Sequence, residues 1–252
     1  MNKVADKTEM KPRLVVFSGA GLSVESGIPA FSGSGGLWNN HKISDVCSFK
    51  TWRKNYNLVT SFYDDLRKDI SDKLPHSGFD VFKNLENKYN VIHYTTNIDD
   101  LFEKTGISCE HIHGELTKVI CMECMTVSDI GYNSVSDATN DGLILHSGGC
   151  NCNLIKPAIT FYNESYDNYP GYNNLKKLIK TIKPDDTILI VGSSLDVIPF
   201  DYFLRHTRCH KYNINPVKGA GFNKDFKHWV NIFEPASTGL KTFEIMMKKY
   251  VK

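Results

Sequence analysis

The 252-residue chain contains no run of about 18 apolar residues, the length that a membrane-spanning helix needs. Its formal charge of +2 is close to balance, so nothing favours nucleic acid or a membrane surface as the main partner. The N-terminal residues are polar up to Leu14, unlike a secretory signal. Internal repeats and long low-complexity tracts are absent as well. We therefore expect a globular, cytoplasmic protein.

Seven cysteines are present, and in a reducing cytoplasm clustered thiols hold metal more often than they form disulfides. Cys121 and Cys124 form one close pair, and after 25 intervening residues Cys150 and Cys152 form another. Two such pairs are what a tetrahedral four-thiolate zinc site requires, although only one residue separates the second pair. The sequence predicts that these four cysteines bind zinc.

Four short apolar runs, each followed by small or polar residues, are typical of buried β-strands. These runs are Leu14–Phe17, Val91–Tyr94, Thr187–Val191 and Tyr212–Ile214. Helical spacing of apolar residues at 79–89 and 238–250 predicts helices. Strands that alternate with helices indicate an α/β fold with a Rossmann-like, doubly wound parallel sheet. Ligands bind at the carboxyl ends of such strands, so the four polar strand ends should gather on one rim.

Two stretches do not follow this alternation of strands and helices. Residues 37–77 are rich in aromatic side chains, and residues 117–156 hold the paired cysteines among many Asn, Ser and Gly. We interpret both as insertions that together form a smaller helical and zinc-binding domain. The Rossmann-like domain then consists of residues 1–36, 78–116 and 157–252.

The loop Gly19-Ala20-Gly21 follows the first predicted strand. Glycines in this position let main-chain N–H groups approach a pyrophosphate closely. The pattern is not a complete G-x-G-x-x-G, because residue 24 is Val, and the acidic ribose ligand expected about 20 residues later is not evident. A tight turn and a phosphate-binding loop are both consistent with this segment.

Two further motifs carry polar side chains that suit catalysis. Asn97 and Asp99 follow the second strand, where they either point into the rim pocket or cap the next helix. His111 and His113 alternate on an extended segment, which predicts that both rings lie on one face. A histidine suits general-base chemistry near neutral pH, although a single histidine is more often structural.

Taken together and in this order, the motifs resemble those of the sirtuins, the NAD-dependent protein deacylases. The resemblance extends from Leu14 to about Asn215. The matching segments are GAGLSVESGIPAF (19–31), SGGLW (34–38), NID (97–99), His113-Gly114, the cysteine pairs, GSSLDVIP (192–199) and INP (214–216).

The resemblance implies two cofactors, NAD and zinc, and a role for each motif. His113 would be the general base that acts on a ribose hydroxyl, and Asn97 and Asp99 would complete the catalytic set. An acylated lysine of a protein or peptide substrate would enter between the two domains, past residues 158–164. The residues implied to contact NAD are Gly19, Ala20, Gly21, Ser23, Ile28, Pro29, Phe31, Thr96, Asn97, Ile98, Asp99, Gly192, Ser193, Ser194 and Asn215.

The chain departs from the sirtuin pattern at four positions. Ser32 replaces an arginine, Thr96 a glutamine, Phe102 a histidine, and Asn163 the glycine of an FGE segment. Serine lacks the charged donor fork that suits a diphosphate, so we expect the Ser32 loop to hold NAD less tightly than an arginine would.

The acyl group is a separate question. Sirtuins that remove succinyl-type groups carry a Tyr-x-x-Arg pair, whereas Tyr63 is followed at that spacing by Leu66, with Arg67 one place later. We therefore expect no preference for acidic acyl groups, and deacetylation is the predicted activity.

Two alternative functions stay open from the sequence. One is a sirtuin-like NAD hydrolase or ADP-ribosyltransferase that needs no acyl-lysine, since the Thr-Thr-Asn segment at 95–97 also fits such enzymes. The other is a non-catalytic NAD-binding sensor whose zinc module docks a partner. The catalytic set with His113, together with the cysteine pairs, favours the deacylase over both.

Overall fold

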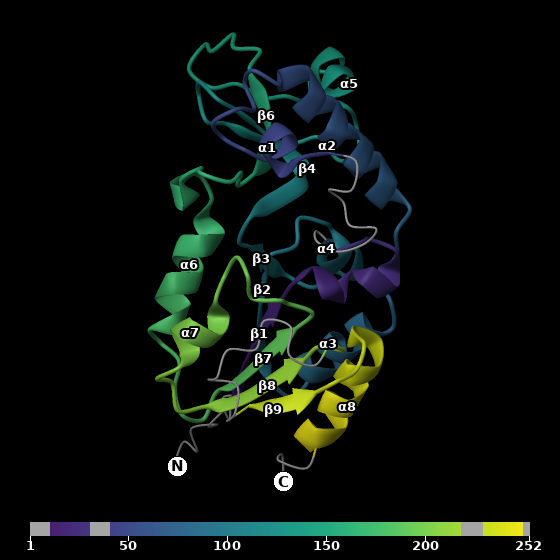
Figure 1. Cartoon of the computed structure of the whole chain (residues 1–252), viewed down its shortest axis with the longest axis vertical. Helices are drawn as coiled ribbons and strands as arrows, with labels where there is room; N and C mark the ends of the chain where they lie inside the picture. The colour runs from purple at the N-terminus through teal and green to yellow at the C-terminus, as the bar shows by residue number, and fades with distance from the viewer. Residues whose placement is uncertain (1–10, 31–40, 218–228, 249–252) are drawn as a thin grey trace, which may run out of the picture.

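A six-stranded parallel sheet, with the strand order β3-β2-β1-β7-β8-β9, forms the centre of the larger part of the molecule (Figure 1). The computed structural model describes residues 11–30, 41–217 and 229–248. Every neighbouring pair of strands is parallel, which confirms the predicted fold class. The strands are β1 (Arg13–Ser18), β2 (Asn90–Thr95), β3 (Cys109–His111), β7 (Thr187–Val191), β8 (His210–Ile214) and β9 (Val230–Ile232).

The four strands predicted from the sequence are β2, β1, β7 and β8, the central strands of this sheet. Their apolar runs are continuous because helices cover both faces of the sheet, which leaves no solvent-facing side. The edge strands β3 and β9 were not predicted. Each has only three residues and lacks a fully buried apolar run.

Alternate residues of β1 face two separate layers of helices. Leu14 and Val16 belong to the hydrophobic cluster that α3 (Gly78–Glu86) and α8 (Ala236–Lys248) cover. Val15 and Phe17 belong to the cluster under α6 (Pro170–Ile179) and α7 (Phe200–Leu204). The helices predicted at 79–89 and 238–250 are therefore confirmed as α3 and α8, with ends shifted by a few residues. No helix of the described residues is long and apolar enough to cross a membrane.

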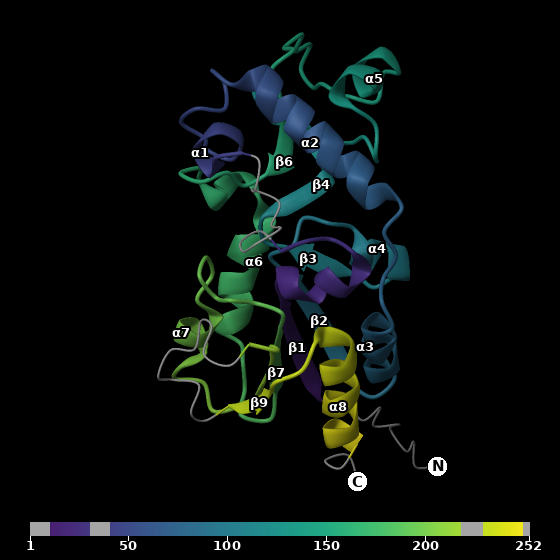
Figure 2. The same ribbon diagram turned by 45° about the vertical axis from the view of Figure 1, so that its right-hand side comes forward.

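A smaller module lies beyond the carboxyl ends of the parallel strands. It contains an antiparallel sheet, β5-β4-β6, and α2 lies along β4 and β6 (Figure 2). Its elements are α1 (Ile43–Val46), α2 (Tyr56–Ser71), β4 (Gly114–Cys121), β5 (Val127–Asp129), α5 (Val135–Asn140) and β6 (Ile155–Ile159). The inner face of α2 shares one hydrophobic cluster with β1, so the two parts pack directly against each other. The predicted division into two domains stays a proposal.

Candidate active site

The loops that follow β1, β2, β7 and β8 meet on one rim, as expected for neighbouring parallel strands. The Gly19 and Gly21 amides donate to the carbonyls of Val191 and Gly192 at 3.0 and 2.8 Å. Asn215 joins the same loops, because its side-chain amide donates to the carbonyl of Ser193 at 3.2 Å. The rim thus brings the predicted residues of the β1, β7 and β8 loops together.

Glycine is required here because two backbones touch. A Cβ on Gly21 would lie 2.8 Å from Cα of Gly192, and Gly192 itself has φ +64°, in the left-handed region. The amides of Gly19 and Gly21 are already bonded to carbonyls. These two N–H groups therefore hold the β1 and β7 loops against each other, and contact of the Gly19-Ala20-Gly21 loop with the NAD diphosphate stays a prediction.

A buried hydrogen-bonded group joins the β1 loop to the β2 loop. The side-chain amide of Asn97 donates to the carbonyl of Gly19 at 3.1 Å and to Ser23 Oγ at 2.9 Å. Ser23 Oγ donates in turn to the Asp99 carboxylate at 2.8 Å. The amide oxygen of Asn97 is buried and has no hydrogen-bond partner among the described residues. A buried acceptor without a donor is the kind of group that a ligand satisfies.

Asp99 has a structural contact in addition to its bond with Ser23. Its other carboxylate oxygen accepts from the amide of Leu101 at 3.3 Å, at the start of α4 (Leu101–Thr105). Asp99 therefore lines the pocket and also holds the first amide of α4, although the N-cap position of that helix is Asp100. Burial raises the pKa of the Asp99 carboxyl, and the hydrogen bond from Ser23 opposes that shift.

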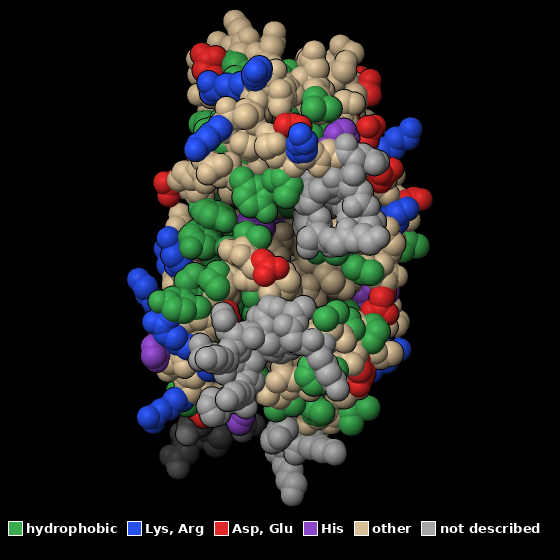
Figure 3. Space-filling view, in the orientation of Figure 1, with side chains coloured by type: hydrophobic (Ala, Val, Ile, Leu, Met, Phe, Trp, Pro, Cys, Tyr) green, Lys and Arg blue, Asp and Glu red, His purple; other side chains and the backbone are tan. Residues whose placement is uncertain are grey.

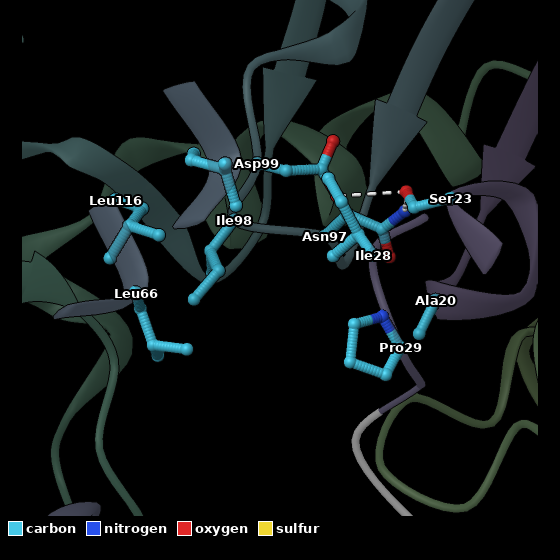
Figure 4. Close-up of a pocket in the computed structure, with 10 residues that line it drawn as sticks. Ala20, Ser23, Ile28, Pro29, Leu66, Asn97, Ile98, Asp99 and Leu116 are labelled. Carbon is cyan, nitrogen blue, oxygen red and sulfur yellow. Dashed lines mark hydrogen bonds between the residues drawn. The ribbon is translucent and has the colours of Figure 1, made fainter. Parts of the chain in front are cut away.

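The polar group lies at one end of a pocket whose other walls are apolar (Figure 4). The rest of the lining comes from the η1 turn (Ala20–Leu22), the segment after η2 (Val24–Ser26), α2, β4 and Ile98 of the β2 loop. The pocket suits a ring that carries one amide, because the ring would contact the apolar walls and the amide would reach the polar group. The lining residues are Ala20, Ser23, Ile28, Pro29, Leu66, Ile70, Asn97, Ile98, Asp99 and Leu116.

His113 lies between β3 and β4, where the chain passes from the larger sheet to the smaller one. Burial lowers the pKa of its imidazole to about 4, so the ring is neutral near pH 7 and able to accept a proton. Its carbonyl accepts from the amide of Thr160 at 2.8 Å. Gly114 follows with φ +84°, and a Cβ there would lie 1.9 Å from the carbonyl oxygen of Ala158, so only glycine fits.

The expectation that both histidines lie on one face is not realised. β3 ends at His111, and the two rings contact different elements. The His113 ring lies 5.9 Å from the ring of Tyr166, whereas the His111 ring contacts Asn97 and Glu103.

Three of the four predicted zinc ligands come together, and a histidine takes the fourth place. One donor atom each of Cys121, Cys124, His146 and Cys150 lies within 4.8 Å of the other three. Three sulfurs and one imidazole nitrogen form a donor set that zinc prefers, at separations that a tetrahedral site permits. Cys152 lies outside this group, where its sulfur accepts from the amide of Leu154 at 3.2 Å.

The structure therefore offers His146 as a candidate fourth ligand, and zinc binding by Cys152 stays a prediction. The amide of Cys152 donates to the sulfur of Cys150 at 3.4 Å. In this arrangement Cys150 is the ligand, and the main chain of Cys152 supports it through that hydrogen bond. The sequence did contain a signal, because His146 and Cys150 are separated by three residues, within the usual spacing of zinc ligands.

Comparison with known proteins identifies the family of this chain. A model of the Sir2 family matches residues 19–199. The chain belongs to the Sir2 family. An NAD-dependent protein deacylase of Aggregatibacter actinomycetemcomitans is 34% identical over 224 residues, which cover 85% of this chain and 98% of the relative. One of Helicobacter hepaticus is 32% identical over 211 residues, covering 77% and 79%.

The fold agrees with solved Sir2 structures. A Sir2 homologue in complex with NAD has a TM-score of 0.76 at 22% identity, over 96% of this chain and 91% of that chain. Another, a mutant in complex with ADP-ribose, has a TM-score of 0.77 at 21% identity, over 96% and 94%. At these identities the likeness establishes the Sir2 fold.

The structure accounts for three of the four departures from the Sir2 pattern. Phe102 packs edge-on against Phe79 in a buried aromatic cluster. Asn163 has φ +65°, a conformation that asparagine tolerates in place of glycine. The Thr96 hydroxyl donates to the carbonyl of Ser18 at 3.2 Å. Ser32, Phe31 and the segment 34–38 lie outside the described residues.

Proposed function

We propose that this protein is an NAD-dependent protein-lysine deacylase, with deacetylation as its main activity. Its relatives at 32–34% identity are named NAD-dependent protein deacylases. The observation that carries the proposal for this chain is the unpaired amide oxygen of Asn97. It lies in an apolar pocket beside Asp99 and Ser23. Further along the chain, His113 lies between β3 and β4.

The residues fit NAD, and each motif has a part in holding it. Asn97 would accept a hydrogen bond from the nicotinamide carboxamide or from a ribose hydroxyl, and Asp99 would keep Ser23 and the β1 loop in place. Ile28 and Pro29 line the pocket and would supply apolar walls against the nicotinamide ring. The adenosine half would lie along the β7 and β8 loops, at the residues predicted there: Gly192, Ser193, Ser194 and Asn215.

His113 is the proposed general base. Its pKa of about 4 keeps the imidazole unprotonated near neutral pH, ready to take a proton from a ribose hydroxyl. Bound NAD supplies the ribose carbon to which the acyl oxygen bonds as nicotinamide leaves. His113 would then assist transfer of the acyl group to that ribose. One water is consumed, so that acyl-lysine, NAD and water give nicotinamide, O-acyl-ADP-ribose and the free lysine.

An acyl-lysine would reach this site between the two modules. On the face shown in Figure 3, hydrophobic side chains gather around a hollow between the upper and lower parts of the molecule. The segment after β6 borders His113, since the Thr160 amide donates to the His113 carbonyl. Tyr162 in the same segment is exposed and suited to contact a peptide.

The pocket offers no cation to an acidic acyl group among the described residues that line it. Leu66 lines the pocket at the position of the arginine found in desuccinylating sirtuins. Arg67 is fully buried and already bonded to the carbonyls of Leu116 and Asn133 and to Asp64. Neutral acyl groups are therefore the proposed substrates. Nicotinamide release with and without an acetyl-lysine peptide tests the proposal.

A further inference from the structure

Each ring nitrogen of His111 faces a hydrogen-bond acceptor. Nδ1 lies 2.8 Å from the main-chain carbonyl oxygen of Asn97, and Nε2 lies 3.1 Å from Oε1 of Glu103. A carbonyl and a carboxylate only accept, so both ring nitrogens need a hydrogen. A neutral imidazole carries one hydrogen and would turn a lone pair toward one of the two oxygens. With Glu103 ionised, the two contacts are satisfied best by the imidazolium form.

The surroundings of the ring favour a positive charge. Glu103 of α4 and Glu115 of β4 each place a carboxylate oxygen within 4.8 Å of the ring nitrogen that faces them. Asp99, on the β2 loop, also interacts with His111, and Lys118 pairs with Glu115 at 2.7 Å. Burial alone would lower the pKa of His111, but the hydrogen bond and charge of Glu103, helped by Glu115, raise it.

We propose that His111 is a positioning residue that, as an imidazolium, ties the main chain of Asn97 to Glu103 and so fixes the Asn97 amide in the pocket. The main chain of Asn97 is held on its other side too, because its N–H donates to Thr95 Oγ1 at 3.0 Å. With both main-chain groups held, the unpaired side-chain oxygen has a defined place. The inference rests on the proposed function only where it assigns Asn97 to NAD.

The pH dependence has a definite sign. The pKa of His111 in the folded protein is raised above the ordinary value of about 6.5. The tie is therefore complete below pH 6.5 and is lost as the pH rises through the folded value. His113 is already unprotonated in that range, because its pKa is about 4. An alkaline decline in nicotinamide release would then report His111.

An NMR titration of the histidine ring nitrogens tests the charge without using activity. We expect both His111 nitrogens to be protonated at pH 6.5 in the wild type. Glu103→Gln should move the midpoint down by about 1 pH unit or more, the effect of losing a paired opposite charge. Glu110→Gln is the matched control, since Glu110 precedes His111 on β3 but its carboxylate accepts from Asn174 at 3.3 Å. A singly protonated ring at pH 6.5, or an unchanged midpoint in Glu103→Gln, would overturn the proposal.

The pH profile of His111→Asn tests the positioning role. The asparagine amide keeps a neutral donor toward Asn97 at every pH but loses the link to Glu103. We expect about tenfold lower kcat/KM for NAD at pH 6.5, the scale of one charge-assisted hydrogen bond, and loss of the alkaline decline. A purely structural role would lower the rate equally at all pH values and would contradict us. If the wild type releases no nicotinamide, the proposed function fails, and the NMR titration still decides the charge of His111.

Discussion

The hydroxyl of Ser23 donates to the carboxylate of Asp99 at 2.8 Å, across 76 residues of sequence. Both side chains are buried, and Ser23 also accepts from the amide of Asn97 at 2.9 Å. One hydroxyl thus orients the carboxylate and the amide that the proposal assigns to the nicotinamide side.

Ser23→Ala should remove both contacts and leave a buried carboxylate oxygen without its donor. We expect a loss of about 1–3 kcal/mol in the free energy of unfolding, the usual result of an unsatisfied buried partner, together with weaker NAD binding. Chemical denaturation and NAD titration measure the two effects. Ser44→Ala is the control, because Ser44 is exposed. Equal stability of the two variants would contradict this account.

His113→Ala should lower acyl transfer by about 10²-fold or more, the scale of a lost general base, while NAD binding largely survives. In the wild type the base works when unprotonated, so activity should fall on the acid side only as the pH approaches about 4. Steady-state rates measured across pH define this acid limb of the pH–rate profile. A limb at pH 6.5 or above would show that the ring has an ordinary pKa or that another group is the base.

His146 and Cys152 lie close in the sequence, but only His146 belongs to the cluster of candidate zinc ligands. His146→Ala should lower the zinc content below one per chain and destabilise the smaller module, since metal binding energy contributes to folding. Cys152→Ser should keep about one zinc, because its sulfur lies outside the cluster. Elemental analysis of both purified variants, with Cys121→Ser as the positive control, decides the matter. Zinc loss in Cys152→Ser with full retention in His146→Ala would restore the four-cysteine prediction.

Leu66→Arg should create a cation in the apolar pocket and shift acyl preference. We expect the ratio of desuccinylation to deacetylation to rise about tenfold or more, as a charged hydrogen bond to the acyl carboxylate would give. Leu58→Arg is the control on the same helix, because Leu58 is exposed. Wild-type protein that already prefers succinyl-lysine would show that the apolar lining does not set the preference.

The sequence predicted the parts of the fold that local patterns determine. The run Leu14–Phe17 could be assigned to a central strand because burial on both faces demands continuous apolar residues. Cys109–His111 could not, because a three-residue edge strand has no such pattern. Whether His146 or Cys152 is the fourth ligand depends on how a long loop folds back. Spacing permits both residues, and only the three-dimensional arrangement separates them.

The hydrogen bonds of the site could not be predicted from local sequence patterns either. The Gly19-Ala20-Gly21 loop was predicted from its composition, but the partner of its amides is the β7 loop, more than 170 residues away. The pairing of His111 with Glu103 required the positions of β3 and α4, which no local pattern supplies. Long-range contacts of this kind are set by packing of the whole core.

The central claim is that the site cleaves NAD in order to remove an acyl group from lysine. The most direct test measures nicotinamide release by the wild type over a range of NAD concentrations, with an acetyl-lysine peptide and with the same peptide carrying unmodified lysine. We expect release that depends on the acetyl group and is matched by formation of deacetylated peptide. Release at the same rate with either peptide, or with none, would contradict deacylation and indicate an NAD hydrolase.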